Sequence, residues 1–286
     1  MRTVRTIAAL REALAGPRRA GETIGLVPTM GALHDGHAEL LRRARAETDL
    51  VVMSLFVNPA QFDEAADLAA YPRTEAADAA IAEAAGVDVL FAPPAEEVYP
   101  DGFATTVKVA GPALGLEGEH RGPGHFEGVA TVVLKLLNMA APDVAYFGQK
   151  DGQQLAVIRR MVRDLDVPVR IEAVETVREP DGLALSSRNA RLGAEERERA
   201  LALHAALRAA SATVAAGAHD AASVVAAARA AMSRYAVDPE YLAVVDADTF
   251  TELGEIDRRA LIAVAARVGD VRLIDNQPLI PNGSVS

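Results

Sequence analysis

The segment PTMGALHDGHAELLRRA, residues 28–44, places two histidines where a strand-like run ends and a helix-like run begins. His34 and His37 are three residues apart, and Gly31 and Gly36 allow close approach to the backbone. The amides and the positive dipole end of a helix N-terminus favour anions. Two imidazoles at such a point are suited to donate hydrogen bonds to phosphate oxygens and to stabilise charge that develops on a phosphoryl group.

Two other roles for this histidine pair remain open. A histidine in a loop is commonly only solvated or hydrogen-bonded, and the pair could instead bind a metal ion. The HxxH spacing is a weak metal signal, because neither a third ligand nor an HExxH pattern accompanies it. The strand–loop–helix context favours the phosphate role.

A second polar segment, FGQKDGQQL at residues 147–155, also lies where a predicted strand passes into a predicted helix. Lys150 offers a positive point charge for a phosphate. Asp151 could accept hydrogen bonds from ribose hydroxyls, although on spacing alone a helix cap is the more common role. Gln154 could hold a hydroxyl or a carboxylate through its amide. Three of the chain's five glutamines lie in this segment.

Further along, the segment LSSRN at residues 185–189 combines two hydroxyls with a guanidinium. It could wrap the β- and γ-phosphates of a triphosphate and close over them, but in isolation it is more typical of an ordinary polar turn. Asn58 and Gln61, in VNPAQF, could contact a small polar substrate. For His125 and Lys135 structural roles are favoured, at a helix entry and as a side chain that snorkels from a helix.

The composition limits the classes of function. Cysteine is absent, which excludes disulfides, thiolate metal sites and cysteine nucleophiles. A formal net charge of −11 argues against a nucleic-acid binder, so positive charge for an anionic substrate must be concentrated locally. No apolar run approaches the ~20 residues that span a bilayer, and no secretory signal is evident. A cytoplasmic enzyme is expected.

The elements that must position these residues follow an alternating pattern. Between residues 23 and 174, apolar runs such as TIGLV, DLVVMSLFV and DVAYFG alternate with amphipathic helical patterns. This alternation is typical of βαβ units around a buried parallel sheet. Ligands of such sheets bind outside the carboxyl ends of the strands, which directs attention to the loops after TIGLV, MSLFV and AYFG.

The pattern changes near residue 176. A polar, turn-rich stretch, REPDGLALSSRNARLG, is followed by two alanine-rich helical patterns at about 194–216 and 220–235 and then by three short strand-like runs. We therefore expect an α/β fold in which a Rossmann-like N-terminal domain, residues 1–176, precedes a smaller α+β C-terminal domain, residues 177–286. The polar loop lies at their junction.

Together these segments resemble the pantothenate synthetase family, which belongs to the HIGH-type nucleotidyltransferases. Six blocks stand in the family's order: PTMGALHDGH, FVNPAQF, YPRT, GHFEGVATVVLKLLN, FGQKDGQQL and REPDGLALSSRN. Leu185 replaces the methionine that usually precedes the serine pair, a change of similar volume that is readily tolerated. RGPGHF is one residue longer than the usual R-P-G-H-F, which puts any role of Arg121 in question.

The resemblance implies roles for particular residues. The implied catalytic residues are His37, His34 and Lys150. The implied ATP-binding residues are His34, His37, Gly148, Lys150, Asp151, Ser186, Ser187 and Arg188. The implied pantoate-binding residues are Met30, Gln61, Gln154 and Asn58. No protein ligand to a metal is implied.

The resemblance also implies a reaction, the ATP-dependent condensation of pantoate with β-alanine to pantothenate. Pantoate's carboxylate attacks the α-phosphorus of Mg-ATP, and the amine of β-alanine then displaces AMP from the resulting pantoyl adenylate. Because a carboxylate is already ionised at neutral pH, the first step needs positioning and charge neutralisation rather than a protein nucleophile. The implied partners are these substrates with Mg²⁺, a second copy of the chain in a homodimer, and neither nucleic acid nor membrane.

Other function classes are separable by experiment. A different nucleotidyltransferase would share HxGH but lack the glutamine-bearing VNPAQF and QQL segments, and its adenylyl acceptor would be a phosphate. A nucleotide sensor would bind ATP without forming AMP. A dinucleotide oxidoreductase is disfavoured because no GxGxxG follows the first strand. A zinc hydrolase would require a metal ion at the histidine pair.

Overall fold

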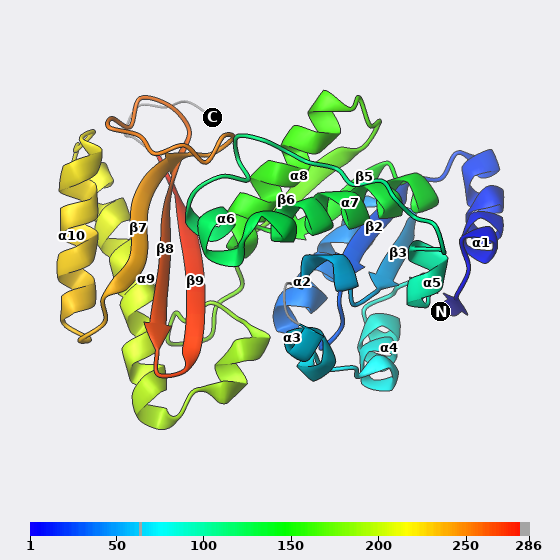
Figure 1. Ribbon diagram of the computed structural model, residues 1–286, viewed down its shortest axis with the longest axis horizontal. Helices are drawn as coiled ribbons and strands as arrows, with labels where there is room; N and C mark the ends of the chain where they lie inside the picture. The colour runs from blue at the N-terminus through cyan, green and yellow to red at the C-terminus, as the bar shows by residue number, and fades with distance from the viewer. Residues whose placement is uncertain (63–64, 281–286) are drawn as a thin grey trace.

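Two bodies of secondary structure lie side by side in the computed structural model, which describes residues 1–62 and 65–280 (Figure 1). One is built around a parallel sheet and the other around an antiparallel sheet. No helix within the described residues is long and apolar enough to cross a membrane.

The larger sheet has six parallel strands in the order β1-β4-β3-β2-β5-β6. They are β1 (Arg2–Val4), β2 (Ile24–Thr29), β3 (Leu50–Leu55), β4 (Val89–Phe91), β5 (Val144–Gly148) and β6 (Arg170–Val174). The central strands β2, β3 and β5 are buried along nearly their whole length, which explains why their sequences are continuous apolar runs. The edge strand β1 has three residues, too few for its sequence to reveal it.

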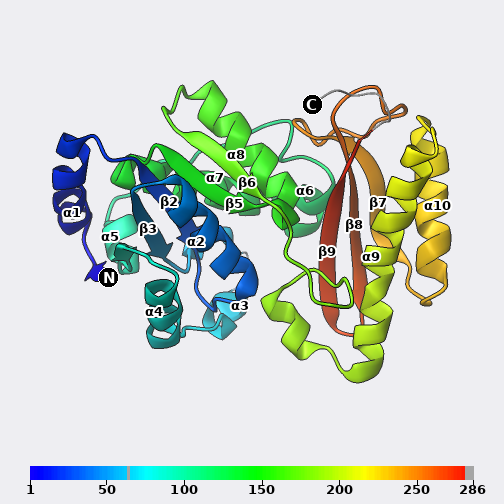
Figure 2. The same cartoon turned by 180° about the vertical axis from the view of Figure 1, so that it is seen from behind.

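Helices cover both faces of this sheet. On one face, α1 (Ile7–Ala20), α7 (Pro123–Ala140) and α8 (Gly152–Asp164) share a hydrophobic core with it. On the opposite face lie α2 (Asp35–Glu47) and α4 (Glu75–Ala84), and Figure 2 shows α2 in front of the strands. The shorter helices are η1 (Pro59–Gln61), α3 (Ala65–Ala70), α5 (Ala95–Val98), α6 (Leu116–Arg121) and η2 (Gln149–Asp151).

The second body contains a three-stranded antiparallel sheet. Its strands are β7 (Pro239–Asp246), β8 (Ala260–Val268) and β9 (Val271–Leu279), preceded by η3 (Ser187–Arg191), α9 (Ala194–Ala215) and α10 (Ala221–Ser233). One face of the sheet packs on α9 and α10, whose many buried alanines let the helices approach closely. The other face meets α8 of the first body through Ala156.

The predicted fold class is confirmed: a Rossmann-like parallel sheet is followed by a smaller antiparallel-sheet domain. The polar segment expected at the junction runs between the end of β6 at Val174 and the start of α9 at Ala194. The division at residue 176 stays a prediction.

Candidate active site

The two loops predicted to bind phosphate lie at the ends of neighbouring central strands. β2 pairs with β5, with Gly25 opposite Val144. From β2 the chain adds β3 and then β4 on one side, whereas β5 and β6 are added on the other side, so the strand order reverses between β2 and β5. Such a reversal of strand order opens a crevice outside the carboxyl ends of the strands, where ligands bind. The loop after β2 carries His34, and the loop after β5 carries Lys150.

A buried carboxylate fixes the loop after β2. Gly31 has a φ of +89°, in the left-handed region that favours glycine, and a Cβ there would lie 2.9 Å from both Asp78 and Leu55. Asp78 of α4 is 2% exposed and accepts hydrogen bonds from the backbone N–H groups of Ala32 and Leu33 at 3.1 and 2.8 Å. Our sequence reasoning missed Asp78. The available signal was a second carboxylate within the alanine-rich run EAADAAIAEAAG.

His34 and His37 cap the N-terminus of α2. Nδ1 of His34 accepts the backbone N–H of Gly36 at 3.1 Å, and Nδ1 of His37 accepts the backbone N–H of His34 at 3.3 Å. A ring nitrogen that accepts such a bond carries no proton, so each neutral imidazole holds its proton on Nε2. Both rings therefore retain one Nε2–H donor for a ligand.

Both imidazoles favour the neutral form. Burial, followed by the neighbouring His34, lowers the pKa of His37 to about 4. Burial, followed by the positive charge of Lys150, lowers the pKa of His34. At neutral pH the pair therefore acts through hydrogen bonds rather than as two cations, and the neutral form is the one that keeps both capping bonds.

Lys150 supplies the positive charge beside this pair. It belongs to η2, its side chain is 17% exposed, and its Nζ lies 3.8 Å from Oδ1 of Asp151. Asp151 occupies the N-cap position of α8, but its side chain makes no capping hydrogen bond, which leaves the carboxylate oxygens free to accept from a ligand. Gly148, at the end of β5, precedes this segment.

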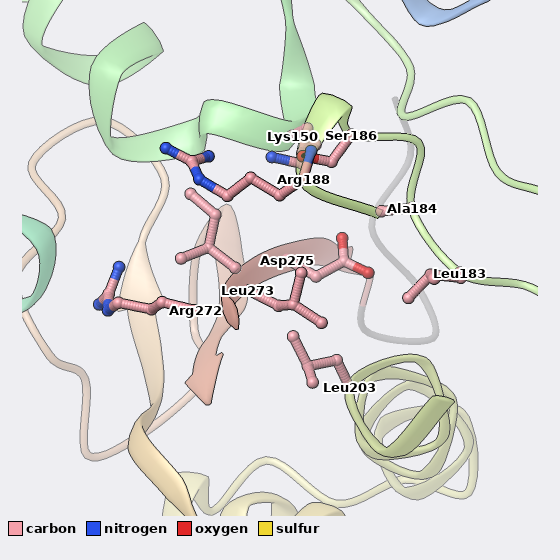
Figure 3. Close-up of a pocket in the computed structure, with 10 residues that line it drawn as sticks. Lys150, Leu183, Ala184, Ser186, Arg188, Leu203, Arg272, Leu273 and Asp275 are labelled. Carbon is pink, nitrogen blue, oxygen red and sulfur yellow. Dashed lines mark hydrogen bonds between the residues drawn. The ribbon is translucent and has the colours of Figure 1, made fainter. Parts of the chain in front are cut away.

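The junction segment adds two more of the predicted residues. Lys150, Ser186 and Arg188 lie at one end of a pocket that also includes Asp275 and Leu273 of β9 (Figure 3). The structure therefore brings together residues from both domains and from the segment between them. Ser187 is exposed.

Three of the four predicted pantoate residues are joined to one another. Nε2 of Gln61 lies 3.1 Å from Sδ of Met30, and Nδ2 of Asn58 donates to Oε1 of Gln61 at 3.1 Å. His125 also meets this group, with Nδ1 3.1 Å from the backbone oxygen of Gln61. Gln154, in the first turn of α8, is half-buried, and its side chain makes no hydrogen bond to the described part of the chain.

Asn58 differs from its neighbours because its amide is saturated. It is 1% exposed, and its Nδ2 donates to Gly128 as well as to Gln61. Its Oδ1 accepts from the hydroxyl of Tyr99 at 2.7 Å and from the backbone N–H of Ala60 at 3.3 Å. An asparagine amide has two donor hydrogens and one acceptor oxygen, so these four bonds use its capacity.

A buried ionic cluster joins α6 to the second sheet, and sequence reasoning missed it. Glu117 accepts from Arg272 of β9 at 2.6 and 3.0 Å, from Arg121 at 2.8 Å and from the hydroxyl of Tyr241 at 3.0 Å. Burial raises the pKa of Glu117, but hydrogen bonds and charges from Arg272 and Arg121 outweigh this and hold it at about 2. Arg121 pairs with Glu117 within α6, whereas Arg272 and Tyr241 make the link to the second sheet. Burial, followed by the positive charge of Arg121, lowers the pKa of Arg188.

We expect Glu117→Gln to lower the free energy of unfolding at pH 7 by about 3 kcal/mol, because the folded pKa lies below the unfolded one. The ionised carboxylate stabilises the fold fully above pH ~4.5, and this contribution is lost as the pH falls towards 2. The free energy of unfolding, measured by urea titration at each pH, should therefore change less between pH ~4.5 and 2 in the variant than in wild type. Asp257→Asn, which removes an exposed pair with Arg258, should leave this pH dependence unchanged. Equal pH dependence for Glu117→Gln and wild type would contradict the prediction.

The parallel sheet carries the histidine pair and the lysine at its reversal point, and the serine–arginine segment of the domain junction lies beside that lysine, as the resemblance to a nucleotidyltransferase led us to expect. The family described as pantoate-β-alanine ligase matches residues 2–278. The chain belongs to this family and is a ligase.

Relatives and solved structures agree with this assignment. The pantothenate synthetase of Thioalkalivibrio sulfidiphilus is 55% identical over 287 residues, covering 99% of this chain and 100% of that protein. A pantothenate synthetase from Thermus thermophilus has a TM-score of 0.89 at 50% identity, covering 97% of this chain and 99% of that one. A pantoate-β-alanine ligase from Francisella tularensis, solved with β-γ ATP and β-alanine, has a TM-score of 0.77 at 35% identity, with 97% of each chain covered.

Proposed function

We propose that this ligase forms pantoyl adenylate and then pantothenate at the carboxyl ends of β2 and β5. The observation that carries the proposal is that the histidine pair and the serine–arginine segment both lie close to Lys150, while the Met30–Gln61 contact begins directly after β2. Each group suits one part of ATP or pantoate. Acting together, they would hold the carboxylate and the α-phosphorus next to each other.

Adenylate formation would depend on charge neutralisation. Pantoate's carboxylate attacks the α-phosphorus, the bond from that phosphorus to the bridging oxygen breaks, and pyrophosphate leaves. Negative charge grows on the phosphate oxygens, where the Nε2–H groups of His34 and His37 would donate and Lys150 would supply a full positive charge. Arg188 and Ser186 would bind the departing pyrophosphate, with Ser187 available once the segment closes over ATP.

The ribose would be bound beside these phosphates. Gly148 leaves room at the end of β5, and the oxygens of Asp151 are free of the helix-capping bond that was the alternative for them. A carboxylate with free lone pairs is suited to accept from ribose hydroxyls. This placement favours the ribose role for Asp151.

Pantoate would be held chiefly by Gln61, Met30 and Gln154. Gln61 and Gln154 carry amides able to bind hydroxyl and carboxylate groups, and Met30 offers an adaptable apolar contact. Asn58 would act through Gln61 rather than by touching the substrate, because the protein already uses all of its hydrogen-bonding capacity.

We expect Gln61→Ala to raise KM for pantoate by about 10- to 100-fold, since a hydrogen bond to a charged group contributes about 1.5–3 kcal/mol. Asn58→Ala should produce a similar rise, because it releases the Gln61 amide. The KM for ATP serves as an internal control and should stay within about twofold. Unchanged pantoate KM in both variants would remove this group from the substrate site.

The second step places a constraint on the histidines. The amine of β-alanine must lose a proton as it attacks the acyl carbon and AMP leaves. Nδ1 of each imidazole already accepts a backbone hydrogen bond, and Nε2 already carries a proton. Neither ring can take the amine's proton without breaking the cap of α2, so we assign that proton to solvent or to a phosphate oxygen.

Magnesium would enter with ATP. Mg²⁺ typically uses substrate phosphates, water and one or two carboxylates rather than a cage of protein ligands. We therefore propose that Mg²⁺ is delivered as Mg-ATP. The homodimer and the cytoplasmic location implied by the sequence also remain proposals, and sedimentation velocity tests the first.

Release of AMP and pyrophosphate from Mg-ATP, with pantoate and β-alanine supplied separately and together, tests the proposal. Exchange of labelled pyrophosphate into ATP should require pantoate alone, whereas AMP and pantothenate should appear only with both substrates. ATP binding without turnover would favour a nucleotide sensor. Adenylyl transfer to a phosphate acceptor would favour a different nucleotidyltransferase.

A further inference from the structure

The loop that carries Lys150 is held by a side chain of the other domain. Asn276, on β9, is 5% exposed, and its Nδ2 donates to the backbone oxygens of Gln149 and Lys150 at 2.9 and 2.8 Å. Its Oδ1 accepts from Nε2 of Gln149 at 3.1 Å. One side-chain amide thus forms hydrogen bonds with two consecutive backbone carbonyls and one side chain of η2.

Close packing and hydrogen-bond geometry make this contact specific for an amide side chain. A Cβ on Gly152, the residue that opens α8, would lie 3.0–3.3 Å from the Asn276 amide, so a larger residue there would press on that amide. Two donor hydrogens on one planar nitrogen match two adjacent carbonyls, and only an amide at this position also offers an acceptor to Gln149. Among the buried polar residues that the structure describes, Asn276 is the one whose side chain donates to the backbone oxygen of Lys150.

The neighbouring residue on β9 restrains the other phosphate-binding segment. Asp275 is 3% exposed and accepts from both terminal nitrogens of Arg178, at 2.6 and 3.2 Å. Arg178 stands at the start of the junction segment and also donates to the backbone oxygen of Gly182. Asp275 in turn accepts the backbone N–H of Asn276 at 2.8 Å. Two consecutive residues of β9 therefore tie both segments to one rigid strand.

We propose that Asn276 is a positioning residue for Lys150 in adenylate formation, an inference that rests on the proposed role of that lysine. The two carbonyls that Asn276 binds flank the Cα of Lys150, so loss of these hydrogen bonds would let the base of the lysine side chain move. A shift of about 1 Å in a group that must meet a developing charge can reduce a rate about 100-fold. The antiparallel domain thereby takes part in the first half-reaction.

The test compares Asn276→Asp with wild type in pantoate-dependent pyrophosphate exchange. Aspartate keeps the shape but replaces the donating NH2 by an oxygen that faces two carbonyls. We expect the exchange rate to fall about 10- to 100-fold, while the rate of pantothenate formation from pantoyl adenylate added as such stays within about twofold. Asn276→Ser keeps one donor and adds no charge, so its exchange rate should lie between those of Asn276→Asp and wild type. This second variant covers the case in which the aspartate variant does not fold. Gln277→Ala, the next residue on β9, is the matched control and should retain wild-type rates.

A double variant decides whether Asn276 acts through the lysine. In a Lys150→Ala background, Asn276→Ser should cost no further activity in the exchange reaction. An equal loss in both backgrounds would assign Asn276 a general structural role and overturn the inference, as would full exchange activity of both single Asn276 variants. Full activity of Lys150→Ala itself would instead overturn the proposed role of the lysine.

Discussion

Lys150→Ala is expected to reduce adenylate formation by about two to three orders of magnitude while the fold is retained. Its ammonium is largely shielded from solvent and close enough to the histidine pair to lower the pKa of both rings. A preorganised charge of this kind stabilises a transition state far more than one in water, and loss of a single such group typically costs about 100- to 1,000-fold in kcat. Pantoate-dependent pyrophosphate exchange measures the effect directly.

Two controls sharpen this prediction. Lys108→Ala removes an exposed lysine that pairs with Glu127 and should leave the exchange rate unchanged. Lys150→Arg should restore only part of the rate, because a planar guanidinium cannot occupy the space of a compact ammonium. An exchange rate within about threefold of wild type for Lys150→Ala would exclude the lysine from the chemical step.

His37→Ala is expected to lower the exchange rate by a similar factor, about 100- to 1,000-fold. The variant removes an Nε2–H donor to the phosphates and also the Nδ1 acceptor that fixes the backbone of His34, so the second donor is misplaced as well. Loss of the cap should by itself cost only about 1 kcal/mol of stability. A large rate loss with a small change in Tm would thus separate chemistry from folding.

The pH dependence of stability gives a second readout for His37. Its pKa is about 4 in the fold, against about 6.5 when unfolded, so between these values the unfolded chain binds the extra proton. The free energy of unfolding should therefore fall as the pH drops from about 6.5 to about 4, and His37→Ala should remove part of that slope. His219→Ala, at an exposed site in the second domain, is the matched control. A slope identical to wild type in His37→Ala would show that the ring is not held neutral by the fold.

The sequence alone was informative wherever a pattern is local. Continuous apolar runs identified the buried strands, and amphipathic spacing identified the helices between them. This works because each strand or helix carries the apolar residues of its buried face within its own sequence. His34, His37 and Lys150 could be singled out since each lies at a strand–helix transition, where the local backbone already favours anions. The order of the six motif blocks was enough to place the chain in its family, and the family comparison confirms it.

Only the tertiary structure showed how these segments are held together. Asp78, Glu117 and Asn276 each bind groups that lie 36 to 155 residues away along the chain, and nothing in their local sequence distinguishes them from surface residues. Asn58 was assigned to the substrate from its place after a strand, but its four hydrogen bonds within the protein suggest an indirect role. Hydrogen-bond saturation and burial depend on which distant atoms pack around a side chain. These properties arise only when β9, α4 and α6 meet the ends of β2 and β5, so no spacing rule in the sequence encodes them.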